Sequence, residues 1–201
     1  LTSGDKVVTA VSTTVLTDST VTSTSSSLTV TVDTTAPTVS ISASSTSLRS
    51  SQTSTLTFTL SEASTNFVVG DITVSGGALS SFAGSGTSYT VTFTPTTNTQ
   101  SGTGSVSVAL GTFTDAASNN NTASSATTIT YDTQVATVSS LSVTSSAGVD
   151  NTYVAGDSIR VTVNFSESVT VTGTPTISVL VGATTRSAAY ISGSGTSALV
   201  F

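Results

Sequence analysis

A ten-residue phrase occurs twice in this 201-residue chain, and the two copies lie 99 residues apart. The first reads VDTTAPTVSI and begins at Val32, and the second, more divergent, reads YDTQVATVSS. Two further phrases return at similar distances: FTLSEAS around Glu62 as VNFSESV around Glu167, and GSGTS at Gly84 and again at Gly193. A repeat of one domain length predicts a tandem array of modules, each with its own core.

The repeat places one complete module in the chain, over residues 34–132. Residues 1–33 correspond to the C-terminal part of an upstream copy, and residues 133–201 to the N-terminal part of a downstream copy. The third copy carries extra residues between Val143 and Ile159, which we expect to form a loop. The N-terminal residues lack the features of a signal peptide, and both ends are expected to be cut from a longer chain.

Apolar residues alternate with Ser and Thr along most of the chain, whereas Gly and Asn gather between these runs. A period of two with many β-branched residues is typical of strands that bury one face. The expected strands of the complete module are residues 38–43, 53–61, 71–75, 79–83, 87–94, 104–110 and 125–131. No stretch has helical periodicity. The sequence therefore predicts an all-β fold of tandem Greek-key β-sandwiches with seven strands per module.

A disordered, mucin-like chain is the alternative for a sequence so rich in Ser and Thr. Such a chain would lack regularly alternating large apolar residues and would contain more proline than Pro37, Pro95 and Pro175. The folded interpretation is therefore favoured. Because the chain has no cysteine, each module must be stabilised by core burial or by bound metal.

Charge excludes two classes of partner. The net charge is −6, with four Lys and Arg residues in total, whereas nucleic acids and anionic membrane surfaces require clustered basic residues. No apolar run reaches the roughly 18–20 residues of a membrane span, so membrane insertion is not expected. We expect neither partner.

Enzymatic activity is also disfavoured. The chain has no His, no Cys and one lysine, Lys6, so a nucleophile and its base cannot be assembled. Paired carboxylates could serve a glycosidase, but their repetition between modules is explained by a structural role. GSGTS lacks the lysine of a phosphate-binding loop and is interpreted as a turn. Rows of Thr suggest ice binding, but a 99-residue repeat is too long for an ice-binding solenoid.

The acidic residues fall where modules meet. Following the strand directions, Glu62 ends the second strand, Asp71 begins the third, and Asp115 lies in the turn before the last. Asp33 ends the preceding copy just before the first strand. All four carboxylates are therefore expected at one pole of the complete module.

The same reasoning brings Asp132 and Glu167 to the next junction. This junction differs, because TTAP has become TQVA and no acidic residue matches Asp71. The similar Gly156–Asp157 pair precedes its glutamate and is expected at the other pole. The sequence thus predicts two unequal joints, the second with the weaker site.

Crowded carboxylates repel each other unless a proton or a cation neutralises them. Because His and Cys are absent, the hard oxygen donors indicate Ca²⁺, and Asn119 and Asn120 could complete its shell. The alternative is that Asp33 and Asp115 form ordinary turns with their own backbone, with Glu62 simply exposed.

Five phrases of the complete module give it a family resemblance. They are VDTTAPTVSI at 32–41, LTFTLSEAS at 56–64, GDITVSGG at 70–77, SGTSYTVTFTP at 85–95 and GTFTDAASNN at 111–120. Together they resemble the bacterial immunoglobulin-like (Big) tandem repeats of large cell-surface adhesins. The resemblance implies immunoglobulin-like sandwiches outside the bacterial cell, with Asp33, Glu62 and Asp115 holding calcium that stiffens the junction.

The expected function is that of a structural extender, stiffened by calcium, in a repetitive extracellular adhesin or surface filament. Its partners would be the neighbouring repeats of the same chain. One alternative is a glycan- or protein-binding module that uses the loop at 143–158. Another is self-association, because residues 1–33 supply the last two strands of a module and residues 133–201 roughly the first five. Chains could then join head to tail.

Overall fold

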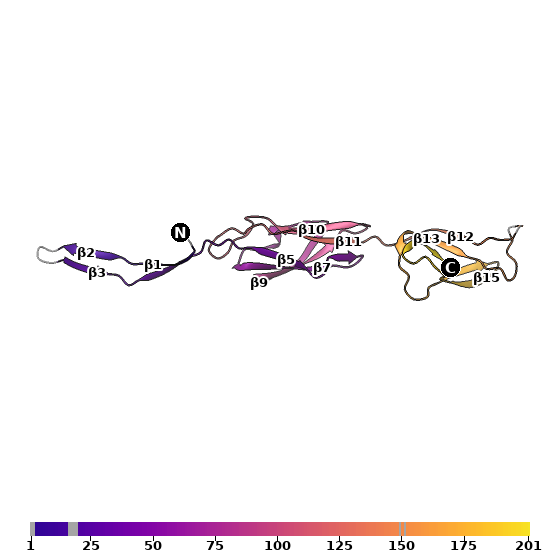
Figure 1. The fold of residues 1–201 in the computed structure, drawn as a ribbon, viewed down its shortest axis with the longest axis horizontal. Coiled ribbons are helices and arrows are strands. Elements are labelled where there is room, and N and C mark those ends of the chain that lie inside the picture. The colour runs from indigo at the N-terminus through magenta and orange to yellow at the C-terminus, as the bar shows by residue number, and fades with distance from the viewer. Residues whose placement is uncertain (1–2, 16–19, 149, 151) are drawn as a thin grey trace. The chain divides into compact units, whose positions relative to one another are not determined.

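The computed structural model describes residues 3–15, 20–148, 150 and 152–201, and it divides into two compact units, Leu1–Gln134 and Val135–Phe201. Apart from one 3-10 turn, η1 (Val69–Asp71), the regular elements of the described residues are β-strands (Figure 1). The predicted all-β fold is confirmed. No helix in the described part of the chain combines the length and the apolar character that crossing a membrane requires.

The central module contains two sheets that enclose one core (Figure 1). The first sheet has the order β5 (Val39–Ala43), β7 (Ser54–Ser64) and β9 (Gly77–Pro95). The second has the order β6 (Ser47–Arg49), β11 (Thr127–Asp132), β10 (Gly102–Val108) and β8 (Ile72–Ser75). Buried and more exposed side chains alternate along most of β7, β10 and β11 and along the second half of β9, as the period of two predicts.

The strands differ from the predicted set in two places. The predicted strands at 79–83 and 87–94 form one continuous strand, β9, so the turn expected at GSGTS is wrong. Gly84 and Gly86 adopt positive φ angles of 128° and 64°, and the pairing with β7 shifts register here. Glycine lets the strand bulge without reversing. β6, a short strand that pairs in parallel with β11, lies outside the predicted strands.

Phe67 centres the aromatic part of the core, although it lies outside every predicted strand. Its ring centroid lies 5.0 Å from that of Phe113, 5.1 Å from that of Tyr89 and 5.7 Å from that of Phe58. The first two contacts are edge-to-face, the geometry that aromatic pairs favour. The connection between β7 and η1 is therefore packed into the core.

Gly104 of β10 is required by close packing. A Cβ atom at this position would lie 2.5 Å from the Phe93 ring, which is fully buried. Gly104→Ala is expected to lower the free energy of unfolding by about 1–3 kcal/mol, because the ring has no free space into which to move. Urea unfolding measures this loss. Ser105→Ala, on the partly exposed face of the same strand, is the control, and an equal loss in both variants would contradict the packing argument.

The N-terminal segment consists of two strand pairs. β1 (Gly4–Val8) pairs antiparallel with β4 (Leu28–Val32), and β2 (Val11–Val15) pairs antiparallel with β3 (Thr20–Thr24). The alternating residues Leu28, Val30 and Val32 lie in β4.

The second unit has a smaller core, which includes Val163, Leu199 and Phe201. One sheet has the order β12 (Val138–Val143), β13 (Val161–Val169) and β16 (Thr196–Val200), and β14 (Thr176–Val181) pairs with β15 (Thr184–Ala189). The extra residues expected after Val143 fall in the connection between β12 and β13.

Candidate metal centre

Three carboxylates meet at one end of the central module. Asp33 follows β4, Glu62 lies near the end of β7, and Asp115 lies in the connection between β10 and β11. One carboxylate oxygen from each residue lies within 4.8 Å of those from the other two. Asp115 is buried, and Asp33 and Glu62 are partly buried. We call these three residues the acid triad.

Asn121 shapes the loop that carries Asp115. Its side chain is fully buried, and its Oδ1 accepts hydrogen bonds from the backbone N–H groups of Thr112 (2.8 Å) and Phe113 (3.0 Å). Its Nδ2 donates to the backbone oxygens of Ala109 and Thr122, both at 2.8 Å. These side-chain hydrogen bonds add to the backbone bonds that join Gly111 and Phe113 to Asn121 across the loop. This role of Asn121 is not predictable from the sequence, in which it is one of three consecutive asparagines.

Asn119 joins the loop to the segment before the module. Its backbone N–H donates to Asp115 Oδ1 and its Nδ2 donates to Asp115 Oδ2, both at 2.9 Å. Nδ2 also donates to the backbone oxygen of Asp33 at 3.3 Å. Asp33 Oδ1 accepts from the backbone N–H of Thr35 at 3.0 Å. Hydrogen bonds thus hold Asp115 within its loop and join that loop to Asp33.

A second set of hydrogen bonds holds the end of β7 against this loop. The Ser64 hydroxyl donates to the backbone oxygen of Thr114 at 2.7 Å, and the Thr114 N–H donates to Asn66 Oδ1 at 3.1 Å. The Tyr89 hydroxyl donates to the backbone oxygen of Ser64 at 2.7 Å. These bonds fix Glu62, two residues before Ser64, near Asp115. No sequence pattern pointed to them.

The electrostatics of the acid triad favour a neutralising partner. Burial raises the pKa of Glu62, and the negative charges of Asp33 and Asp115 raise it further. Burial also acts to raise the pKa of Asp115, but hydrogen bonds from Asn119 and from the Ala117 backbone outweigh it, so this pKa is lowered. Asp115 is therefore held as a carboxylate, whereas the ionised form of Glu62 is disfavoured by the neighbouring negative charges.

Asp71, the fourth carboxylate expected at this pole, forms a local hydrogen bond. It is not part of the acid triad, and its Oδ2 accepts a hydrogen bond of 2.8 Å from the backbone N–H of Val68, which closes the turn before β8. Asp157 forms the same contact with the N–H of Val154, also at 2.8 Å. The two Gly-Asp pairs therefore share one local structure, an aspartate that caps its own turn.

The turn role of Asp71 gives a prediction. Asp71→Ala is expected to destabilise the module by about 1 kcal/mol, through loss of the cap, in the presence and in the absence of calcium alike. Thermal unfolding in both conditions measures the two losses. If the variant instead lost the stabilisation that calcium gives, Asp71 would be a ligand after all.

The residues predicted for the second junction lie in different units. Asp132 ends β11, and its Oδ1 accepts a hydrogen bond of 3.1 Å from the backbone N–H of Gln134. Glu167 lies in β13, and its Oε1 is buried without a hydrogen-bond partner among the described atoms. A calcium site formed by Asp132 and Glu167 stays a prediction.

The acid triad fits a hard cation by its chemistry. Its donors are carboxylate oxygens from three separate elements, the ligand type that Ca²⁺ prefers. Asp33, Glu62 and Asp115 are the residues that would hold the ion, and backbone carbonyls and water would supply the remaining ligands.

Comparison with known proteins points to one family. A family model described as a bacterial Ig-like domain matches residues 33–131. The matched segment begins at Asp33 and contains both sheets of the central module, together with Glu62 and Asp115. No curated protein and no solved structure matches the chain.

Proposed function

Residues 33–131 belong to the bacterial Ig-like domain family, and from this membership we propose that the chain is an extender segment of an extracellular bacterial surface protein. The family is one of structural, non-enzymatic modules. The repeated phrases support tandem modules, in which length and stiffness are the useful properties. An extender must resist bending where one module joins the next.

One observation carries the stiffening part of the proposal: the carboxylate oxygens of the acid triad lie within 4.8 Å of one another. Asp33 lies in the segment that leads into the module, whereas Glu62 and Asp115 belong to its sandwich. A calcium ion bound by all three would neutralise their repulsion and tie that segment to the sandwich. The ion would therefore restrict motion between β4 and the module.

Calorimetric titration of the 201-residue chain with CaCl₂ tests the metal assignment. We expect saturable uptake, with MgCl₂ binding more weakly because Mg²⁺ demands stricter octahedral geometry and gives up water reluctantly. The triple variant with Asp33→Asn, Glu62→Gln and Asp115→Asn is the control. Uptake that is unchanged in this variant would place the ion elsewhere.

Small-angle X-ray scattering tests the extender role separately from metal binding. With calcium, the chain is expected to give a narrower distribution of particle dimensions than without it. A compact particle with the maximum dimension of a single module would contradict the extender role, whatever the titration shows.

The pKa shifts predict how stability depends on pH in calcium-depleted buffer. Because the pKa of Glu62 is raised in the folded state, protonating it stabilises the fold, so stability rises as pH falls through that pKa. The lowered pKa of Asp115 acts in the opposite direction and removes stability as pH falls below its ordinary value. Thermal unfolding from neutral to acidic pH should therefore pass through a maximum. With saturating calcium, acidification should only destabilise, because protons compete with the ion for Glu62.

A further inference from the structure

Residues 33–38 connect β4 to β5 and are docked on the loop that carries Asp115. We call these residues the entrance linker. The backbone oxygen of Pro37 accepts a hydrogen bond of 2.9 Å from the N–H of Thr122, and the Pro37 side chain is fully buried. The backbone oxygen of Asp33 accepts a hydrogen bond of 3.3 Å from Asn119 Nδ2. The loop therefore holds the entrance linker near both of its ends.

Asn119, which makes the contact to Asp33, is itself fixed by Asp115. Its N–H and its Nδ2 both donate to the Asp115 carboxylate at 2.9 Å, and its backbone oxygen accepts from the Asp115 N–H at 3.2 Å. Asn119 is partly buried, whereas the neighbouring Asn120 is exposed. A side chain that is already ordered loses little conformational freedom when it binds a further group, so the contact to Asp33 is formed at low entropic cost.

The amide nitrogen of Asn119 faces both acidic residues. Nδ2 donates to the carboxylate of Asp115 and to the backbone oxygen of Asp33. An amide nitrogen is a hydrogen-bond donor, whereas a cation is coordinated by oxygen. Asn119 thus joins the module to the entrance linker as a donor, a role different from that of completing a calcium shell.

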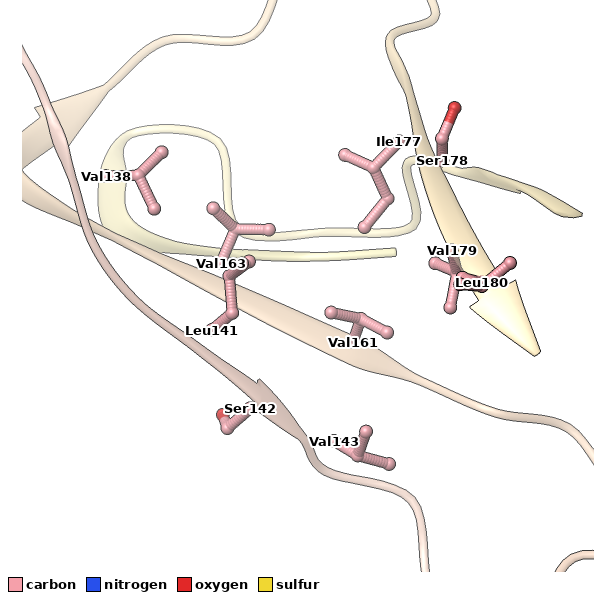
Figure 2. A pocket seen from close by; sticks show the side chains of 10 residues that line it. All are labelled: Val138, Leu141, Ser142, Val143, Val161, Val163, Ile177, Ser178, Val179 and Leu180. Atoms are coloured by element: carbon pink, nitrogen blue, oxygen red, sulfur yellow. The ribbon is translucent and has the colours of Figure 1, made fainter. Parts of the chain in front are cut away.

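The C-terminal end of the entrance linker is attached in a way that recurs in the second unit. The N–H of Thr38 donates to Ser61 Oγ at 2.9 Å, and its oxygen accepts from the Ser61 N–H at 3.0 Å. Thr137 and Ser166 form the same two bonds, at 3.0 Å and 2.8 Å. The next residue, Val138, lines an apolar groove of about 470 Å³ in the second unit (Figure 2). Hydrogen bonding of the residue before the first strand to the neighbouring strand is therefore a repeated feature of this chain.

We propose that these hydrogen bonds lock the entrance linker onto the central module without an ion, and that Asn119 is the positioning residue that holds Asp33 beside Asp115. The calcium part of this inference rests on the function proposed above. Because crowded carboxylates repel each other, a site whose ligands are held together in advance needs less rearrangement when the ion binds. The joint between β4 and the module is then ordered in calcium-free buffer, and calcium strengthens an arrangement that already exists.

Nuclear magnetic resonance relaxation of the ¹⁵N-labelled 201-residue chain in calcium-free buffer tests the lock. The backbone order parameters of Asp33 and Thr34 should lie near about 0.85, the value of rigid backbone, and should fall toward about 0.6 in Asn119→Ala. Asn120→Ala, at the exposed neighbour, is the matched control and should keep the native values. Low order parameters in the native chain, or native values in Asn119→Ala, would overturn the proposal.

Asn119→Asp separates hydrogen bonding from packing, because aspartate has nearly the same shape but no side-chain N–H to donate when it is ionised. The order parameters of Asp33 and Thr34 should fall as they do in Asn119→Ala, and retention of the native values would contradict a role for the amide. The Thr122 amide, which donates to Pro37, should stay protected from hydrogen exchange in both variants, because its bond does not involve Asn119.

Calorimetric titration with CaCl₂ gives a second measurement. Asn119→Ala should weaken calcium binding by about tenfold or more, the effect expected for a residue that orients metal ligands, whereas Asn120→Ala should bind as the native chain does. Equal affinity of the two variants would show that Asn119 does not position Asp33 for the ion. A native chain that takes up no calcium would contradict the function proposed above, and the order parameters would still decide whether Asn119 locks the entrance linker.

Discussion

Asn121→Ala is expected to destabilise the central module by about 3 kcal/mol or more. The fully buried side chain satisfies two backbone N–H groups and two backbone oxygens, and alanine would leave all four without that partner. The two N–H groups, of Thr112 and the buried Phe113, account for most of the expected loss, because both oxygens belong to the exposed residues Ala109 and Thr122. A buried polar group without a hydrogen bond costs about 1–3 kcal/mol. Partial rearrangement of the loop would limit the total, which is why the four costs are not expected to add fully.

Urea unfolding followed by far-ultraviolet circular dichroism measures this loss. Asn120→Ala is the matched control, because Asn120 is the exposed neighbour and its removal should change stability by no more than about 0.5 kcal/mol. We also expect weaker calcium binding in Asn121→Ala, since the loop that holds Asp115 would be less well ordered. Equal stability of the two variants would show that the backbone of this loop does not depend on the Asn121 amide.

Calcium is expected to raise the stability of the native chain and to lose this effect when Glu62 is replaced by Gln. One site at a hundred times its dissociation constant adds about 2.7 kcal/mol. Without calcium, Glu62→Gln should instead raise the stability, because it removes a negative charge that burial, Asp33 and Asp115 all disfavour. The variant should therefore melt above the native chain in calcium-depleted buffer and below it in saturating calcium.

Paired thermal melts of native chain and variant, with and without calcium, measure this reversal. Asp71→Ala is the control, as its loss should be the same in both buffers. If Glu62→Gln were destabilising to the same extent in both conditions, Glu62 would act through packing alone and the acid triad would not be a calcium site.

Much of the strand pattern could be predicted from local sequence. In β5, β10 and β11 the large apolar residues fall on one face only, and burying that face requires an extended chain. The turn predicted at GSGTS was wrong, because glycine permits both a chain reversal and a bulge within a strand. The pairing of β9 with β7 selects the bulge. β6 was missed because three residues carry too little periodicity to be recognised.

The candidate site was predictable in part. Following strand directions placed Asp33, Glu62 and Asp115 at one pole, and the structure brings these three together. The carboxylate of Asp71 accepts a hydrogen bond in the turn before β8, and strand directions alone do not predict such a local bond. Asp71 as a calcium ligand stays a prediction.

The length of the module, its all-β character and the meeting of Asp33, Glu62 and Asp115 were all predictable from the amino-acid sequence. These follow from properties that act over a few residues or repeat along the chain. Two other features became clear from the three-dimensional structure: Asn121 orders the loop of Asp115, and Ser64 fixes the end of β7 against Thr114. Such contacts join segments that are distant in sequence, as Asn119 joins Asp33. No local sequence pattern predicts them, because neither residue of a pair differs from other polar residues until folding brings the two together.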